Sequence, residues 1–467
     1  MTRRLIALLS LLCGAVALVG PAHGQTIDEA LATAYLNNPI LEAGRAGLRA
    51  TDEQVPQALA NWRPSVDVEG DISRAQTFSN ARTSGDKDQI RTPRGVALNI
   101  TQPLFRGFRT EAEIREAENT VSAERYRLLA TEQGVLLDAA TAYMDVVRDQ
   151  AVLGLNVSNE QVLQRQLEAT RDRFQVGEIT RTDVSQAEAR LAGASADRVQ
   201  AEGDLEAARA AYRNVVGQAP EKLSAPDAPA AGPTDKKDAI ATARKDNPNV
   251  LAALFDERAA RDRVDGVRGE LLPNLDLSGK LSRDLESASN TSRVNEKSIK
   301  ATLSIPLYQS GAVHSRLREA RQTVGRERLE SEQARRDAEE DATRWWEMLM
   351  TARARVESFS AQVDANGIAL EGVEREAAVG ARTVLDILDA EQELLDSRVN
   401  LVGARRDEIV ATFALTAAIG QLTARHLNLP VEYYDPGRHY RKVRDKWVGT
   451  GYDAEKEENE KRNSGKK

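Results

Sequence analysis

The sequence predicts a mostly α-helical protein with a small β part, built from two similar halves. Three observations predict this fold class. Short motifs recur at an almost constant spacing, two proline-free stretches are each long enough for a helix of more than fifteen turns, and short alternating stretches of apolar and polar residues precede them. Aromatic residues make up only 4% of the chain, which suits long packed helices better than a compact aromatic core.

The repeat is visible as pairs of equivalent motifs. Asn-Pro at 38–39 recurs at 247–248, an offset of 209, and Val-Gly at 176–177 recurs at 379–380, an offset of 203. The offset changes once, between the two expected strands of each half, so one surface loop is six residues shorter in the second half. Such regularity over the whole chain indicates two structurally equivalent halves.

Each half is expected to contain two strands, a long helix, a glycine turn and a shorter returning helix, after an opening helical segment. The first repeat spans 25–220, with strands at 65–78 and 95–103, a long helix at 108–174, a turn at 175–181 and a helix at 182–216. A Pro- and Ala-rich linker at 221–235 follows. The second repeat spans 236–430, with strands at 274–283 and 298–306, a long helix at 311–378, a turn at 379–383 and a helix at 384–418.

The expected strands alternate between apolar and polar residues, so each has one apolar and one polar face. Val66, Val68 and Ile72 alternate with Asp67 and other polar residues in the first of them. A strand of about ten residues is long enough to cross a bilayer when it is tilted. A water-soluble sheet that rests on a helix gives the same pattern, and alternation alone leaves both interpretations open.

The two ends of the chain have different compositions from the repeats. Residues 1–24 combine two arginines, an apolar run and a small-residue end, which predicts a removable secretory signal peptide. Residues 431–467 are polar and charged, and we expect them to form a mobile tail. The formal net charge of −8 argues against nucleic acid as a partner.

The turn at 379–383 leads directly into a helix that carries two acidic residues. Asp386 and Asp389 are three positions apart, so they project from the same side of the helix. From spacing alone they are either functional carboxylates, a solvated helix face, or caps of the helix start at Thr383. The turn at 175–181 and Asp183 form a weaker copy of this stretch.

With its duplicated halves, its paired Val-Gly turns and the Pro-Leu-Phe and Pro-Leu-Tyr strand ends at 103–105 and 306–308, the chain resembles the TolC family of outer-membrane efflux and type I secretion proteins. The resemblance implies a homotrimer, with a 12-stranded β-barrel shared in the outer membrane and a helical tunnel in the periplasm. It also implies outer-membrane lipid, a periplasmic adaptor protein and an inner-membrane transporter of the ABC or RND class as partners.

The resemblance also implies roles for residues at the two turns. Asp386 and Asp389 fall on the two aspartate rings that line the family's pore constriction. Arg382 falls on the arginine that restrains the closed state, and its family partners fall on Thr182 and Asp183. The turns themselves are expected to dock the adaptor, through Val176, Gly177, Val379 and Gly380.

One position departs from the family's pattern. The family has a tyrosine five residues before the restraining arginine, and this chain has Ala377 there. We therefore expect the closed state to depend more on Arg382. The sequence shows no arrangement of a nucleophile and a base, no phosphate loop and no metal-ligand spacing, so we expect no enzyme activity and no cofactor. The alternative function is a soluble periplasmic coiled-coil scaffold or adaptor.

Overall fold

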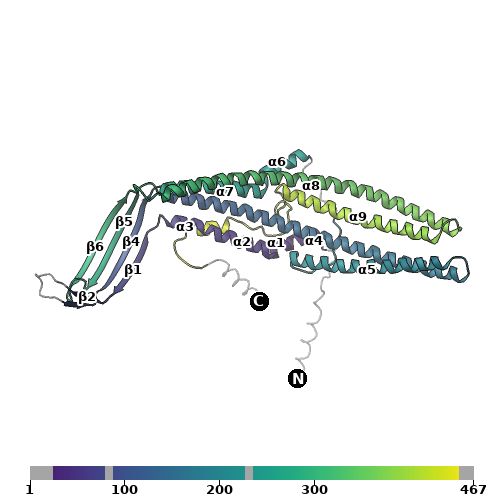
Figure 1. Ribbon diagram of the computed structural model, residues 1–467, viewed down its shortest axis with the longest axis horizontal. Helices are drawn as coiled ribbons and strands as arrows, with labels where there is room; N and C mark the ends of the chain where they lie inside the picture. Colours follow the sequence, from purple (N-terminus) through teal and green to yellow (C-terminus); the bar gives the residue numbers. More distant parts are fainter. Residues whose placement is uncertain (1–24, 79–87, 227–234, 452–467) are drawn as a thin grey trace, which may run out of the picture. The chain divides into compact units, whose positions relative to one another are not determined.

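The computed structural model describes residues 25–78, 88–226 and 235–451. Over these residues the protein is mostly helical with a small β part, as the sequence predicts (Figure 1). The expected signal peptide, most of the expected linker and the last 16 residues of the expected tail lie outside the described residues. None of the described helices is both long enough and apolar enough to cross a membrane.

The two halves follow nearly the same order of helices and strands. The first half has α1 (Ile27–Asn37), α2 (Pro39–Asp52), α3 (Gln54–Ala60), β1 (Ser65–Ile72), β2 (Ala75–Phe78), β3 (Asp88–Arg91), β4 (Arg94–Arg106), α4 (Arg109–Gln175) and α5 (Arg181–Val216). The second half has α6 (Lys236–Asp246), α7 (Pro248–Gly269), β5 (Asn274–Leu285), β6 (Arg293–Ser304), α8 (Ala312–Ala378) and α9 (Val384–Ala418), followed by α10 (Arg438–Val443). It has one helix, α7, in place of α2 and α3, and its described residues contain no equivalent of β2 and β3. Helices α4 and α8 are both 67 residues long, and each starts and ends 203 positions from the other.

The Asn-Pro pairs begin a helix in the same way in both halves. The side chain of Asn38 accepts a hydrogen bond of 2.9 Å from the backbone N–H of Ile40 at the start of α2. Asn247 accepts an equivalent bond of 2.9 Å from Asn249 at the start of α7. Each proline occupies the first helical position, where its missing N–H has no helical partner to lose.

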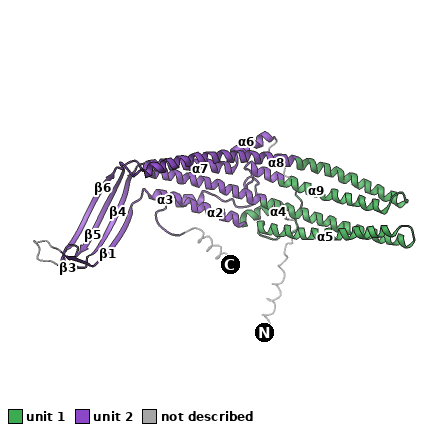
Figure 2. Ribbon diagram, in the orientation of Figure 1, with its two compact units in different colours: residues 1–37, 138–230, 351–410 green, residues 38–137, 231–350, 411–467 purple. Residues whose placement is uncertain are grey.

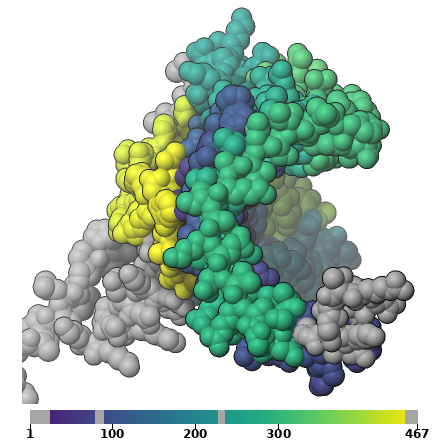
Figure 3. Space-filling model, turned by 90° about the vertical axis from the view of Figure 1, so that its left-hand side faces the viewer, coloured from purple at the N-terminus to yellow at the C-terminus, as the bar shows by residue number. Residues whose placement is uncertain are grey.

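Four strands form one antiparallel sheet in the order β1-β4-β5-β6, so the centre of the sheet joins the two halves. The register places Val68 opposite Leu98, Leu98 opposite Leu281, and Gly279 opposite Ile299. The apolar residues of all four strands therefore share one face, and large side chains on it are exposed. Strands β5 and β6, coloured teal to green, are in front in the view of Figure 3.

The first strand ends earlier than the sequence predicts. The sequence predicts one strand at 65–78, but β1 ends at Ile72, and β2 pairs with β3 in a separate two-stranded sheet. The backbone N–H of Ser73 donates to the carbonyl of Pro93 at 2.8 Å and closes the larger sheet. Pro93 has no N–H to return a bond, so the ladder cannot continue past it.

The described residues divide into two units (Figure 2). Among the described residues, unit 1 contains 25–37, 138–226 and 351–410, and therefore both glycine turns. Its buried centre includes Tyr143, whose hydroxyl donates to the carbonyls of Gln25 and Ser224 at 2.8 and 2.6 Å. Unit 2 contains 38–78, 88–137, 235–350 and 411–451, and therefore the sheet. One of its apolar clusters is formed by Val55, Ala58, Ala117 and Val121.

Part of the expected mobile tail is folded. Residues up to 451 are described, and α10 packs within unit 2 on α2 and α4. Nδ1 of His439 lies 3.2 Å from a carboxylate oxygen of the fully buried Asp52, and the ring of Tyr440 stacks under the Arg125 guanidinium. The charged composition concealed this contact, because the partners of His439 and Tyr440 lie more than 300 residues away in the sequence.

Candidate functional site: the two glycine turns

The two glycine turns have nearly the same backbone. Gly177 follows α4 with φ +84°, and Gly380 follows α8 with φ +80°. The N–H of Glu178 donates to the carbonyl of Arg173, and the N–H of Ala381 donates to the carbonyl of Glu376, at 3.0 and 2.9 Å. This is the Schellman helix ending, in which the left-handed position favours glycine. The two Val-Gly pairs therefore end α4 and α8 with the same backbone conformation.

Each turn is followed by the same capping box. The N–H of Thr180 donates to Oδ2 of Asp183 at 2.8 Å, and the N–H of Asp183 donates back to the threonine hydroxyl at 3.3 Å. Thr383 and Asp386 repeat this exchange at 2.8 and 3.3 Å. Such a box satisfies two N–H groups that a helix start otherwise leaves unpaired. In the single chain Asp386 is thus the acidic member of the capping box whose N-cap is Thr383, and the bonds from Thr383 lower its pKa below the usual value.

The single chain does not bring Arg382 to Thr182 or Asp183. The Arg382 guanidinium instead binds Glu376 of α8, with Nε 2.8 Å from Oε2. Both side chains of this pair are about half exposed, so the contact is weak. Ala377, which follows Glu376 in α8, is half-buried.

The single chain pairs Asp389 with a partner that the sequence did not indicate. Nη2 of Arg190, on α5, lies 2.5 Å from Oδ1 of Asp389 on α9. This pair joins the two hairpins, α4–α5 and α8–α9. Beside it, an apolar cluster packs the hairpins together, with Leu163, Leu191 and Ala194 from the first and Val384 and Leu388 from the second. No local pattern marks Arg190, because it lies 199 residues from Asp389.

The valines of the two turns are exposed. Val176 is 73% exposed and Val379 is 81% exposed, although both are large apolar side chains. The glycines next to them have open space where a side chain would be. Each hairpin therefore ends in a small apolar surface on a fixed backbone.

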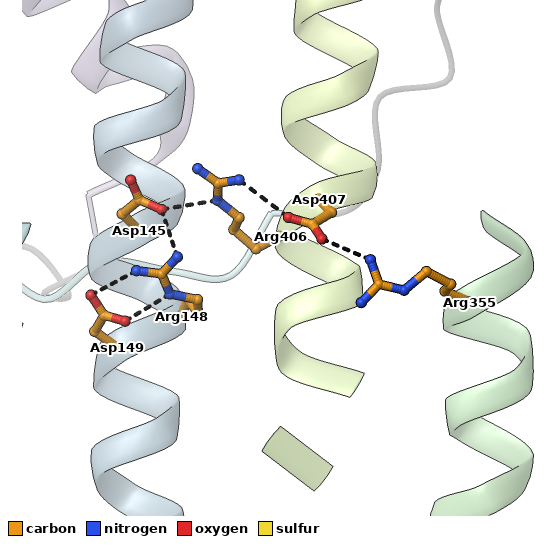
Figure 4. Close-up of polar contacts among 6 residues, drawn as sticks. All are labelled: Asp145, Arg148, Asp149, Arg355, Arg406 and Asp407. Carbon is orange, nitrogen blue, oxygen red and sulfur yellow. Dashed lines mark hydrogen bonds and ion pairs between the residues drawn. The ribbon is translucent and has the colours of Figure 1, made fainter. Parts of the chain in front are cut away.

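An ion-pair network connects three helices further along unit 1 (Figure 4). Arg406 of α9 binds Asp145 of α4 at 2.9 Å and its neighbour Asp407 at 3.2 Å. Asp407 also accepts a bond from Arg355 of α8 at 3.2 Å, while Arg148 binds Asp145 at 3.1 Å. The network sets the lateral positions of α4, α8 and α9. Within the described ranges, no group of three His, Cys, Asp or Glu side chains is placed to hold a metal ion.

The sequence and the fold both match known outer-membrane proteins. The profile of the family described as "Outer membrane efflux protein" matches residues 30–218 and 239–421. The chain is 35% identical to the outer membrane efflux protein BepC of Brucella suis over 449 residues. This alignment covers 96% of each of the two chains. The chain is 31% identical to the outer membrane protein TolC of Vibrio cholerae, over 70% of this chain and 77% of that one.

The fold agrees with this match. The structure of the Campylobacter jejuni CmeC outer membrane channel aligns with a TM-score of 0.75 at 15% identity, over 90% of this chain and 89% of that chain. The two parts of the family match correspond to the two structural halves, and both contain a long helix and a glycine turn. The chain therefore belongs to the outer membrane efflux protein family, whose members are outer-membrane transport channels and not enzymes.

Proposed function

We propose that three copies of this chain form the outer-membrane exit duct of a tripartite exporter, with the sheet of unit 2 in the membrane. The observation that carries this proposal is the apolar face of the sheet, on which Val68 and Ile299 are 72% and 84% exposed. Water-soluble sheets bury such a face, whereas a bilayer accepts it. Strands β1 and β6 are the free edges of the sheet, so three copies joined edge to edge give twelve strands in a closed ring.

The two turns are the proposed docking points for a periplasmic adaptor. Val176 and Val379 supply exposed apolar contacts, and Gly177 and Gly380 let another backbone approach closely. An adaptor of this kind links the duct to an inner-membrane transporter of the ABC or RND class. Energy comes from that transporter, because the duct conducts passively.

Asp386 and Asp389 are the proposed lining of a gate at the turns. Three copies would place six carboxylates around one axis, and rings of carboxylates favour cations over anions. Asp386 keeps its charge because the bonds from Thr383 stabilise the carboxylate form. Asp389 is paired with Arg190, whose positive charge offsets the negative charge of the carboxylate. The net charge of the gate therefore depends on this ion pair.

Arg382 is the proposed closed-state restraint. Within one chain it binds Glu376, so a contact with Thr182 and Asp183 requires the first turn of a neighbouring copy. Arg382 can leave Glu376 for Thr182 and Asp183 at little cost in free energy, because its ion pair with Glu376 is exposed. Position 377, where the family has a tyrosine, is an alanine in this chain. The proposed contact of Arg382 therefore has no second restraint from the end of α8.

Membrane extraction and planar bilayers test the duct. We expect the protein to stay with outer membranes through a carbonate wash, to leave them only in detergent, and to form cation-selective channels in bilayers. Release without detergent would support a soluble periplasmic scaffold and contradict the duct. Stable insertion without any ion current would also contradict it.

A further inference from the structure

The two hairpins of unit 1 differ in charge at one equivalent pair of positions. In the first hairpin, Nη2 of Arg171 on α4 lies 2.6 Å from Oε1 of Glu188 on α5. The repeat offset of 203 maps these residues onto Glu374 of α8 and Glu391 of α9. A salt bridge in the first hairpin is therefore replaced by two carboxyl groups in the second. The duplication supplies an internal control for what this replacement does.

The surroundings of the two glutamates on the returning helices also differ. Glu188 is exposed, whereas Glu391 is buried, with 9% of the residue accessible to solvent. Glu391 lies one turn after Leu388, on the side of α9 that packs against the first hairpin. Its Oε2 atom is buried and has no hydrogen-bond partner. A buried carboxylate without a partner is costly, and a protonated carboxyl is much less so.

Few charged groups face Glu391 from the helices around it. Glu374 faces it from α8 and Arg165 faces it from α4. On α5, Arg190 is bound to Asp389. Burial and then Glu374 raise the pKa of Glu391 to about 7, and Arg165 offsets this only in part.

We propose that Glu374 and Glu391 form a proton-sensitive contact, which packs the second hairpin firmly when Glu391 is protonated and loosens α9 from the first hairpin when both carboxyls are ionised. The pH dependence follows from the direction of the shift. Because the pKa of Glu391 in the folded hairpin lies above its usual value, the stability that it contributes is present at acidic pH and is lost as the pH rises through about 7. A link to gating rests on the proposed duct function, but the contact itself does not.

Amide hydrogen exchange of the full-length protein in detergent tests the contact between Glu374 and Glu391 by measuring how well the start of α9 is protected. We expect protection of the amides at 384–398, corrected for intrinsic exchange, to be about tenfold higher at pH 5.5 than at pH 8. The equivalent amides of the first hairpin, at 181–195, provide the reference and should change little. Equal protection of 384–398 at the two pH values would overturn the proposal.

Two substitutions separate the proton effect from other effects of pH. Glu391→Gln keeps the shape of a protonated carboxyl, so protection should stay high at both pH values. Glu374→Arg restores the charge pattern of the first hairpin and should also remove the pH dependence. Arg171→Glu creates two carboxyls at the exposed first site and is the matched control, with little pH dependence expected. A pH dependence that persists in Glu391→Gln would contradict the role of this carboxyl.

Conductance gives a separate readout of the gating consequence. In planar bilayers the wild-type closed-state current should rise between pH 5.5 and 8, and the Glu391→Gln current should stay at its acidic value. If exchange follows pH as expected while no variant conducts, the duct function fails and the proton-sensitive contact stands. If the channels conduct but exchange does not change with pH, the contact fails and the duct stands.

Discussion

Asp389 of α9 and Arg190 of α5 form an ion pair, with 2.5 Å between Oδ1 and Nη2, that joins the two hairpins of unit 1. One of the two carboxylates proposed for the gate is thus engaged by its own chain. Asp386, three residues earlier, is engaged differently, in the capping box with Thr383 at the start of α9. The two aspartates therefore have separate structural roles, and their contributions to a gate can be separated by substitution.

Substitution of Arg190 by Ala should release Asp389 and loosen the hairpins. The loss of stability should be below about 1 kcal/mol, because both side chains are substantially exposed. In planar bilayers we expect a higher closed-state current and stronger cation selectivity. Arg171→Ala, which removes the exposed pair within the first hairpin, is the control and should leave selectivity as it is. Equal selectivity of Arg190→Ala and the wild type would count against Asp389 as a gate residue.

Substitution of Asp386 by Asn should separate capping from charge. An asparagine side chain still accepts the bonds from Thr383, so helix stability should change by less than about 0.5 kcal/mol, whereas Asp386→Ala should cost about 1 kcal/mol. Thermal unfolding measures both. Combined with Asp389→Ala, either substitution should abolish cation selectivity, and Asp183→Asn at the first turn serves as the control. Unchanged selectivity in the combined variants would remove the gate assignment.

Substitution of Arg382 by Ser should raise the closed-state current, because no tyrosine at position 377 provides a second restraint. Glu376→Gln is the informative counterpart. It frees Arg382 from its observed partner, so it should favour contact with Thr182 and Asp183 of a neighbouring copy and lower the current. If the two variants shift the current in the same direction, Arg382 does not restrain the closed state.

Substitution of Leu388 by Ala should destabilise the packing between the hairpins. Leu388 is buried in the cluster with Leu163 and Ala194, so the expected cost is about 2–4 kcal/mol. Leu385→Ala, on the same helix but at a side chain that is 38% exposed, should cost below about 1 kcal/mol. Urea unfolding followed by a probe on α9 would measure the difference. Similar costs for the two leucines would place the interface elsewhere.

Cysteine cross-linking should reveal how copies meet. Strand β5 is the repeat equivalent of β1, and β6 is the equivalent of β4, so the observed pairing of Ile100 with Gly279 predicts that Leu303 of one copy lies opposite Gly70 of the next. Gly70→Cys with Leu303→Cys should form an intermolecular disulfide, since directly opposite residues are close enough. Gly70→Cys with Ile299→Cys, four positions away on the same face of β6, is the mismatched control. Cross-linking of the mismatched pair alone would refute this register.

The features that the sequence predicts well are those that repeat locally. The Asn-Pro pairs, the Val-Gly turns and the long proline-free runs each specify a backbone conformation within a few residues, and the structure places the turns at equivalent helix ends. The contacts that depend on helix rotation could not be predicted. Arg190 and Asp389, or His439 and Asp52, meet only because helices distant in sequence turn particular faces toward each other.

The charge pattern was also ambiguous until burial was known. Glu188 and Glu391 occupy equivalent positions in similar sequence surroundings, and only the packing of α9 distinguishes an exposed ion pair from a buried carboxyl. The early end of β1 had a visible cause in Pro93. The residues of 65–78 alone do not reveal it, because Pro93 lies on the partner side of the sheet, next to β4.

The pairing of β4 with β5 has a consequence for the number of copies in the proposed ring. This contact between the halves is the same kind of contact that β6 makes with β1 of a neighbouring copy in the proposed ring. A polypeptide of half this length, with a single hairpin, already carries both of the edges that such a ring needs. Two such hairpins in one chain replace every second contact between subunits by a contact within a chain, so three copies close the proposed ring instead of six.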